Sequence, residues 1–344
     1  MTRWTEDFLG PGFSQTTLEL HGDDEGDVVA TLVRYRAEDE FGTSLAGQYV
    51  AQPFALLAIH GWNDYFYHQE FARQITALGG HFYAIDLRKY GRSHREGQSW
   101  GYMTDLSTYD EDIHAALDVI FHAHGYDIPC VLYGHSTGGL TATLWAERHP
   151  GLLAGLILNS PWLEFQGSTL IRQLGQPLLD TVASISPTTV FPLSGNDFYQ
   201  RLLTGWLDKD EQLTGEMIGD PFYDGGWQPD PRYRHPSSFP IRAGWIAAIL
   251  RGHAQVAEGL NIDCPVLVMT SNKSILLESW SPQMRGADTV LDVEQIWKRV
   301  PTLGHVTTLV RLENAIHDVL LSRASVREEA YDHVGRWLHG YLRA

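Results

Sequence analysis

The amino-acid sequence predicts an α/β protein: a mainly parallel central sheet with helices on both faces and an inserted, mainly helical cap. Strand-like and helix-like segments alternate along both ends of the chain, which is typical of a parallel sheet covered by helices. The alternation stops after Trp162 and resumes near Pro265. A third observation is a serine between two glycines, placed where a predicted strand meets a predicted helix.

The first two strands are expected near the amino terminus. Thr16–Leu20 and Val28–Tyr35 flank a turn-like stretch rich in Gly and Asp, which predicts an antiparallel pair. The later strands are expected at Phe54–Ile59, His81–Leu87, Pro129–Tyr133, Ala154–Asn159, Pro265–Met269 and Thr307–Leu312. The helices between and after them are expected at Glu70–Leu78, Asp110–His122, Thr137–Arg148, Asp292–Lys298 and Val326–Leu342.

The middle of the chain predicts an insertion into this sheet. Residues 163–260 are rich in Pro, Gly and aromatic residues and contain no convincing strand. We therefore expect a core made of residues 1–162 and 261–344, with 163–260 as a cap. A separately folding binding domain is the weaker alternative, since the flanking strands need each other to bury their faces. The aromatic residues of the cap either line an apolar pocket or pack its own core: Trp206, Phe222, Tyr223, Trp227, Tyr233 and Phe239.

Composition limits the function classes. The chain has 344 residues, is 43% apolar and carries a formal charge of −17, so nucleic acid or an anionic membrane surface would be repelled. Cys130 and Cys264 adjoin predicted core strands and are expected to be small buried side chains without a disulfide. We find no apolar signal segment and no stretch that could span a bilayer, so we expect a cytoplasmic protein without integral membrane association.

Ser136 is the candidate nucleophile. It stands at the centre of Gly134-His-Ser-Thr-Gly138, between the predicted strand and helix. A sharp turn there would project the hydroxyl beyond the sheet, and the two glycines would leave room for it. An ordinary strand–loop–helix junction is the alternative interpretation.

His317 is the candidate base. A serine hydroxyl is a poor nucleophile near neutral pH and needs a base, which in turn needs an orienting carboxylate. Ligands of open α/β sheets bind beyond the carboxyl ends of the strands, and His317 follows the last predicted strand. His305 precedes that strand and should lie at the opposite edge, whereas the side chain of His135 should point away from that of Ser136.

Asp288 is the candidate acid, with Glu164 as a conceivable substitute. Asp288 lies between a predicted strand and a helix, at the edge where Ser136 and His317 are expected. Glu164 follows the preceding strand. Asp263 falls at the wrong end of its strand, and Asp292 begins Asp-Val-Glu-Gln, which predicts a helix cap completed by Gln295.

Two backbone N–H groups are expected to bind an oxyanion. Thr137 follows the serine directly and supplies one of them at the start of a helix. The other is expected from Trp62 in the turn His60-Gly-Trp-Asn-Asp64, where Gly61 permits a backbone shape that directs this N–H inward. An ordinary glycine turn is the alternative.

With these pieces in place, the chain resembles the α/β-hydrolase superfamily, and within it the monoacylglycerol lipase/lysophospholipase group, also classed with serine aminopeptidase-like hydrolases. Ser136, Asp288 and His317 occur in the chain order typical of that superfamily. The matching segments are His60-Gly61, Asp86-Leu-Arg-Lys-Tyr-Gly-Arg-Ser93, Gly134-His-Ser-Thr-Gly-Gly139, Arg285-Gly-Ala-Asp288 and Ala315-Ile-His317. Lys89 and Tyr90 replace the Gly-His that is usual in the group. The resemblance implies that Trp62 and Thr137 are the oxyanion donors and that Leu163–Leu260 is a lid over an acyl pocket.

The leading functional hypothesis is a serine carboxylester hydrolase acting on a small, neutral and apolar ester. The alternatives are an amidase or serine aminopeptidase with the same triad, and a catalytically silent binder of small ligands. An aminopeptidase would need acidic groups in the cap, for which the candidates are Asp208, Asp210, Glu211 and Glu216. We expect no cofactor and no metal, because neither a metal-ligand spacing nor a phosphate loop with its Lys-Ser/Thr is present. The sequence leaves the oligomeric state open.

Overall fold

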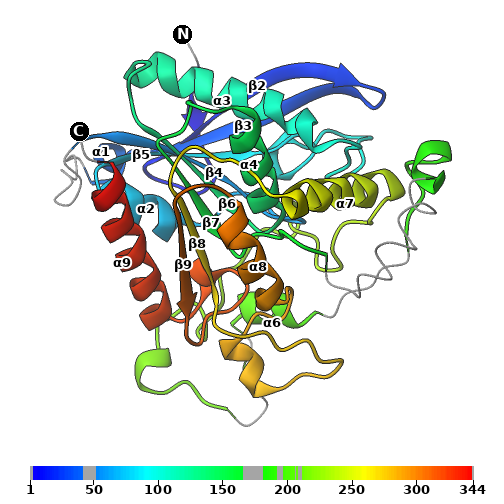
Figure 1. Cartoon of the computed structure of the whole chain (residues 1–344). Helices are drawn as coiled ribbons and strands as arrows, with labels where there is room; N and C mark the ends of the chain where they lie inside the picture. Colours follow the sequence, from blue (N-terminus) through cyan, green and yellow to red (C-terminus); the bar gives the residue numbers. More distant parts are fainter. Residues whose placement is uncertain are drawn as a thin grey trace.

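The computed structural model describes residues 3–41, 52–165, 181–191, 197–205, 207 and 211–342. These residues form one nine-stranded sheet with the order β1-β2-β3-β5-β4-β6-β7-β8-β9 (Figure 1). The first three strands and β5 pair antiparallel, and the six strands from β5 to β9 in that order pair parallel. The strands are β1 Thr5–Glu6, β2 Phe13–Asp23, β3 Gly26–Tyr35, β4 Phe54–Ile59, β5 Gly80–Asp86, β6 Cys130–His135, β7 Gly155–Asn159, β8 Val266–Ser271 and β9 Thr307–Leu312.

Helices cover both faces of the sheet (Figure 1). Successive side chains of a strand point to opposite faces, so Leu57 and Ile59 of β4 join one hydrophobic core while Leu56 and Ala58 join the other. The first core packs α3, α4 and α8, and the second packs α2 and α9. The helices are α1 Ala37–Phe41, α2 Gln69–Ala77, α3 Tyr109–His124, α4 Thr137–Arg148, α6 Phe198–Leu203, α7 Ala243–Glu258, α8 Val293–Arg299 and α9 Ala324–Tyr341. Short 3₁₀ turns are η1 Gly91–Ser93, η2 Leu106–Thr108, η3 Gly215–Met217, η4 Pro282–Gly286, η5 Val300–Thr302 and η6 Val319–Leu321.

The α/β fold class predicted from the sequence is confirmed. Phe54–Ile59, Thr137–Arg148 and Thr307–Leu312 have the predicted bounds, and the other predicted core elements are present with shifted ends. Two short elements were not predicted, β1 and α1. Each is too short to give a periodic pattern, and β1 exists only because it pairs with β2.

The cap prediction concerns the chain between β7 and β8. These two strands pair directly, so the chain leaves the sheet at the end of β7 and returns to it at β8. The described part of 163–260 holds α6, η3 and α7, and α7 packs against α4 in the first core. Trp206, Asp208 and Asp210 lie outside the described residues. The division into core and cap stays a prediction.

Lys89 and Tyr90, which replace the usual Gly-His, lie in the loop after β5. Lys89 has a left-handed φ of 63° and a side chain that is only 1% exposed. Its ammonium group contacts Asp23 and Glu25 of the β2–β3 hairpin, at 2.5 and 2.6 Å. A buried lysine needs such partners, because an isolated buried charge is costly. The substitution therefore ties this loop to the amino-terminal hairpin.

Two further sequence expectations concern the thiols and the membrane. Cys130 and Cys264 are buried free thiols, and burial raises the pKa of each to about 12. Within the described ranges, no helix combines the length and apolar character needed to cross a membrane.

Candidate active site

Ser136 occupies a strained turn between β6 and α4. Its φ of 54° and ψ of −117° are unusual for a residue with a side chain and place the serine in a sharp elbow. The neighbouring glycines are required by close backbone contacts. A Cβ on Gly134 would lie 2.5 Å from the Gly138 oxygen, and one on Gly138 would lie 2.2 Å from the His60 oxygen. This turn therefore requires glycine at positions 134 and 138.

The turn after β4 lies against the elbow. A Cβ on Gly61 would meet the Cβ of Ser136 at 3.1 Å, so the turn that holds Trp62 adjoins the serine directly. The next residue, Asn63, has a left-handed φ of 53°. Within the described part of the chain, the backbone N–H groups of Trp62 and Thr137 donate to no protein acceptor. Both are therefore able to donate to an oxygen that enters beside Ser136.

His317 and Asp288 form a buried pair. His317 Nδ1 lies 2.9 Å from Asp288 Oδ2, and the two residues are 2% and 0% exposed. The other carboxylate oxygen of Asp288 accepts from the N–H groups of Val290 and Leu291, both at 2.8 Å. Since Nδ1 is engaged by Asp288, the Nε2 atom is the one that can exchange a proton elsewhere.

The long stretch before Asp288 does not displace it. The chain leaves β8, and Ser274 then forms a parallel bridge with Asp288, supported by a hydrogen bond from Asp288 N to Lys273 O. The residues between them form a loop that includes η4. The chain therefore returns to the end of β8 before it reaches Asp288.

The other acidic candidates have other partners. The carboxylate of Glu164 accepts from Arg299 of α8, with Nε at 2.9 Å. Asp292 caps α8 by accepting from Glu294 N, as the sequence pattern predicts. The side chain of Gln295 donates through Nε2 to the other carboxylate oxygen of Asp292, a contact that differs from the predicted bond to the backbone of the cap residue. Asp263 accepts from the N–H of Gly151. The structure thus brings Asp288, and not these three, to His317.

His317 and the elbow meet at the carboxyl ends of β9 and β6. His135, which precedes Ser136, has its ring centroid 4.9 Å from that of His317. His135 Nδ1 lies 3.1 Å from Asn159 O, and the same oxygen accepts from Ser136 N. The imidazole of His135 is therefore engaged by the carboxyl end of β7.

Residues of the predicted cap contact His317 and the turn that holds Trp62. The ring of Tyr199 packs edge-on against His317, with centroids 5.3 Å apart. Arg234 forms a buried ion pair with Asp64 of the oxyanion turn, at 2.7 Å. Burial alone would lower the pKa of Arg234, but Asp64 and nearby tyrosines raise it above its ordinary value. The sequence pattern did not point to this pair, because nothing in the chain order links residues so far apart.

Hydrogen bonds also join the oxyanion turn to the cap. Asn63 Nδ2 donates to His235 O, and His235 N donates back to Asn63 Oδ1, at 2.9 and 3.0 Å. The indole of Trp62 donates to Ser238 Oγ. Together with the Arg234–Asp64 pair, these contacts fix the turn that carries the Trp62 N–H.

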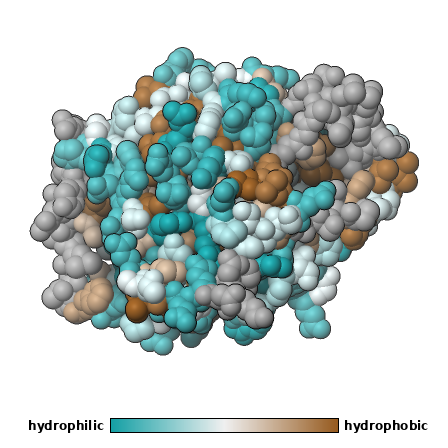
Figure 2. All heavy atoms as spheres, turned by 90° about the horizontal axis from the view of Figure 1, so that it is seen from below, coloured by the Kyte–Doolittle hydropathy of each residue, from teal (hydrophilic) through white to brown (hydrophobic). Residues whose placement is uncertain are grey.

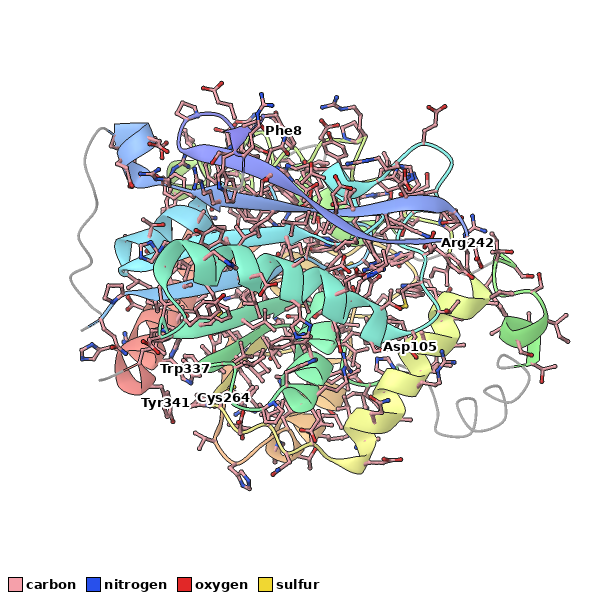
Figure 3. The ribbon with its side chains drawn as sticks, turned by 90° about the horizontal axis from the view of Figure 1, so that it is seen from above. Phe8, Asp105, Arg242, Cys264, Trp337 and Tyr341 are labelled. Carbon is pink, nitrogen blue, oxygen red and sulfur yellow. The ribbon has the colours of Figure 1, made fainter. Side chains whose placement is uncertain are left out.

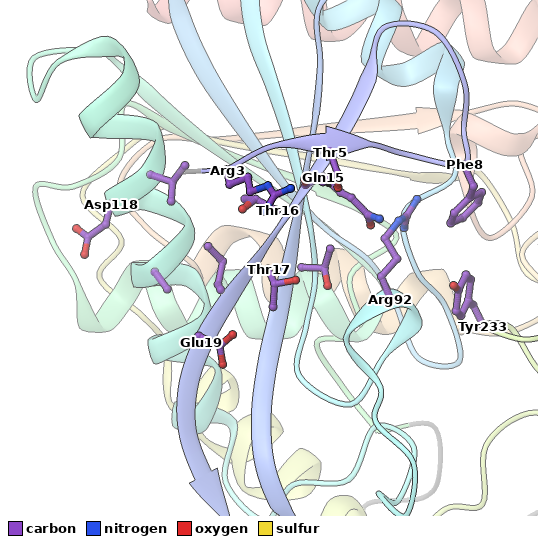
Figure 4. Close-up of a pocket in the computed structure, with 14 residues that line it drawn as sticks. Arg3, Thr5, Phe8, Gln15, Thr16, Thr17, Glu19, Arg92, Asp118 and Tyr233 are labelled. Carbon is purple, nitrogen blue, oxygen red and sulfur yellow. Dashed lines mark hydrogen bonds between the residues drawn. The ribbon is translucent and has the colours of Figure 1, made fainter. Parts of the chain in front are cut away.

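The described residues leave small cavities near the site and a large groove elsewhere. One cavity of about 20 Å³ lies behind His60 and His135, and one of about 10 Å³ lies between Thr137 and Trp245. A groove of about 920 Å³ runs along the outer strands of the amino terminus (Figure 4), and it includes no residue of the candidate site. The side seen from below carries mainly hydrophilic residues with small hydrophobic groups among them (Figure 2).

Most of the chain matches a known protein family. Residues 53–322 match the family described as serine aminopeptidase, S33. The chain belongs to this family. The match includes the elbow, the oxyanion turn, Asp288 and His317, which agrees with the resemblance seen in the sequence. Among the residues that the structure describes, no group of three or more His, Cys, Asp or Glu side chains is arranged to hold a metal ion.

Individual proteins are similar to this member of the serine aminopeptidase family. A monoacylglycerol lipase of Mycolicibacterium smegmatis is 31% identical over 221 residues, which are 63% of this chain and 69% of the relative. A carboxyl esterase of Bacillus coagulans has a similar fold, with a TM-score of 0.63, 17% identity and coverage of 96% and 99% of the two chains. A monoglyceride lipase of Saccharomyces cerevisiae gives a TM-score of 0.60 with 16% identity and coverage of 100% and 96%. The two solved structures establish the α/β-hydrolase fold.

Proposed function

We propose that this protein hydrolyses neutral carboxylic esters, as a lipase- or esterase-like member of its family. The observation that carries the proposal is the buried Asp288–His317 pair beside the strained turn of Ser136. The similarity to a monoacylglycerol lipase supports an ester substrate.

Each residue of the site has a role in this reaction. His317 Nε2 takes the proton of Ser136 as its hydroxyl attacks the ester carbonyl, and Asp288 orients the imidazole and stabilises its charged form. The N–H groups of Trp62 and Thr137 bind the oxyanion that develops on the carbonyl oxygen. The protonated His317 then donates its proton to the leaving alcohol, and the acyl group stays on Ser136.

The second half of the reaction repeats these steps with water. His317 takes a proton from a water molecule, which attacks the acyl-enzyme, and the tetrahedral intermediate again forms at the two N–H groups. Collapse of this intermediate releases the carboxylic acid and restores the Ser136 hydroxyl.

Two of the four acidic candidates of the predicted cap, Glu211 and Glu216, lie within the described residues, and neither supports a substrate with a free amino terminus. The carboxylate of Glu211 lies 2.6 Å from the guanidinium of Arg285, and the side chain of Glu216 is exposed on η3. Glu211 is thus paired with a cation of the chain itself and Glu216 faces solvent, which counts against either as the ligand of a substrate ammonium group. An aminoacyl anilide is accordingly a poor expected substrate.

The proposal is tested with a fluorophosphonate label and a substrate panel. The wild-type protein should be labelled at Ser136 and should hydrolyse p-nitrophenyl butyrate and a monoacylglycerol, with an aminoacyl anilide as the peptide-like control. Ser136→Ala should stay folded, lose the label and lose roughly 10⁴-fold or more in kcat. Retention of a tenth of the activity by the purified variant would contradict the assignment, and an unlabelled, inactive wild type would favour a ligand binder.

A further inference from the structure

Asp318 follows the candidate base directly and is fully buried, with no exposed surface. Its Oδ1 atom accepts from the backbone N–H of Leu320 at 3.0 Å, which caps η6, and from Asn159 Nδ2 at 2.6 Å. The chemistry proposed for Ser136 and His317 assigns no task to this carboxylate. A buried carboxylate needs specific partners, and those of Asp318 lie on other parts of the site.

Asn159, at the end of β7, is the partner that links two loops. Its backbone oxygen accepts from Ser136 N at 3.1 Å. Its side chain donates to Asp318 Oδ1 and to Tyr133 Oη, and its Oδ1 accepts from Val319 N at 3.2 Å. One residue thus holds the elbow through its backbone and the loop of His317 through its side chain.

The two oxygens of Asp318 have different surroundings. The Oδ2 atom faces His68 Nδ1 at 3.7 Å and His135 Nε2 at 3.9 Å, and it accepts no hydrogen bond from the part of the chain that the structure describes. Burial would raise the pKa of Asp318, but these imidazoles and the hydrogen bonds from Asn159 and Leu320 bring it below its ordinary value. The carboxylate of Asp318 is ionised at neutral pH. Its Oδ1 atom is the one that accepts the hydrogen bonds from Asn159 and Leu320.

We infer that Asp318 is a positioning residue, which acts with Asn159 to hold the His317 loop in register with the Ser136 elbow. The inference rests on the proposed function and names residues that the sequence did not single out. Proton transfer needs Ser136 and His317 in a fixed geometry, and a displacement of about 1 Å can cost on the order of 100-fold in rate. Loss of the Asp318–Asn159 bond should therefore lower kcat through the position of the base.

The test compares turnover per active site in the full-length chain. Asn159→Ala and Asp318→Ala should lower kcat on p-nitrophenyl butyrate by roughly 10- to 100-fold, with KM within about twofold, after active sites are counted with the fluorophosphonate. Because both variants remove the Asp318–Asn159 bond, the loss in the double variant should be much smaller than the product of the two single losses. If the fold-losses in kcat of the two single variants multiply in the double variant, the two residues act independently and the shared positioning role is overturned.

Milder variants separate this role from folding. Asp318→Ser keeps a cap acceptor for Leu320 but cannot reach Asn159, so it should lose turnover like Asp318→Ala. Asp318→Asn keeps the Oδ1 acceptor and should retain most of the wild-type turnover. Equal losses in Asp318→Asn and Asp318→Ala would mean that the charge, and not the hydrogen bond, is what matters, and would overturn the inference.

Asp105 offers a matched control. It caps the 3₁₀ turn η2 through Ser107 N, as Asp318 caps η6, but its side chain is exposed and lies beside α7 (Figure 3). Asp105→Ala should keep wild-type turnover per site. If the wild type is labelled and Ser136→Ala is inactive, the proposed function stands. Unchanged turnover per labelled site in the Asn159 and Asp318 variants then rejects the positioning role alone.

Discussion

At the residue scale, the carboxylate that pairs with His317 among the residues of the structure's described ranges is Asp288. The pair is buried, and the second oxygen of Asp288 is held by two backbone N–H groups. Glu164, the alternative considered from the sequence, accepts from Arg299. Hydrogen bonds to both of its oxygens keep the carboxylate of Asp288 in one orientation toward the imidazole.

The identity of the acid leads to a prediction for two variants. Asp288→Asn should lower kcat by roughly 10⁴-fold, because an amide stabilises the wrong tautomer of His317. Glu164→Gln should stay within a few-fold of wild type, since its carboxylate bonds to α8. Steady-state kinetics on an activated ester, with the melting temperature of each variant, decide between them. An inactive Glu164→Gln beside a near-wild-type Asp288→Asn would place the acid on the earlier strand.

At the scale of elements, α7 is the part of the predicted cap that packs most directly on the core. Its Trp245 lies against Trp62 of the oxyanion turn, with ring centroids 4.0 Å apart, and is 2% exposed. The cavity of about 10 Å³ beside Thr137 is lined by Trp245 and Ile249. It is far smaller than the hundreds of Å³ that enclose a typical ligand, so Trp245 limits the space beside the oxyanion turn.

A smaller side chain at this position should change the preference for acyl length. Trp245→Leu and Trp245→Ala should raise the ratio of kcat/KM for octanoyl over butyryl esters by roughly tenfold, the scale on which an apolar pocket discriminates. Trp4→Ala, at a half-buried tryptophan on the amino-terminal strands, is the control. A chain-length profile that is unchanged in both Trp245 variants would remove α7 from the acyl pocket.

At the scale of the whole molecule, the formal charge of −17 acts on any charged substrate. Like charges repel, so a neutral monoacylglycerol should have a higher kcat/KM than an anionic lysophospholipid of the same acyl chain. The Debye length falls from about 10 Å at 0.1 M to about 3 Å at 1 M salt, so added salt should narrow the difference. Initial rates on both lipids at two salt concentrations measure how the difference in kcat/KM depends on salt. A preference for the anionic lipid at low salt would contradict the prediction.

The stability of the whole fold should depend on a half-buried histidine, His124. Burial, with the nearby His81 and Arg34, lowers the pKa of His124 to about 4, and the ring bonds to Tyr83 Oη. The unfolded chain, with an ordinary histidine pKa near 6.5, binds more protons between these values. The stabilisation from neutral His124 is therefore complete above pH 6.5 and is lost as the pH falls toward 4.

A histidine variant tests this dependence. The free energy of unfolding should decrease from pH 7 to pH 5, and His124→Gln should reduce that decrease because glutamine does not titrate. His122→Gln, at an exposed position of the same helix, should keep the wild-type dependence. Urea unfolding at the two pH values gives the measurement. Equal pH dependence in wild type and His124→Gln would show that His124 does not carry the effect.

The sequence by itself determined the features that depend on local pattern. Hydrophobic periodicity predicts the α/β fold class and the helix Thr137–Arg148, because each element must bury one face. Gly134 and Gly138 mark the elbow, because the backbone contacts of that turn exclude any side chain. Ser136 and His317 could be selected because the carboxyl ends of parallel strands share one edge of the sheet.

Only the tertiary structure decided what joins distant segments. The bond between His317 and Asp288, the Arg299 partner of Glu164 and the Arg234–Asp64 pair each link residues whose separation follows no local period. The same holds for Asn159 and Asp318, 159 residues apart in the chain, whose contact exists only after β7 and the loop beyond β9 meet. Local pattern fixes which face of an element is buried, whereas the pairing of buried polar groups depends on how all the elements pack together.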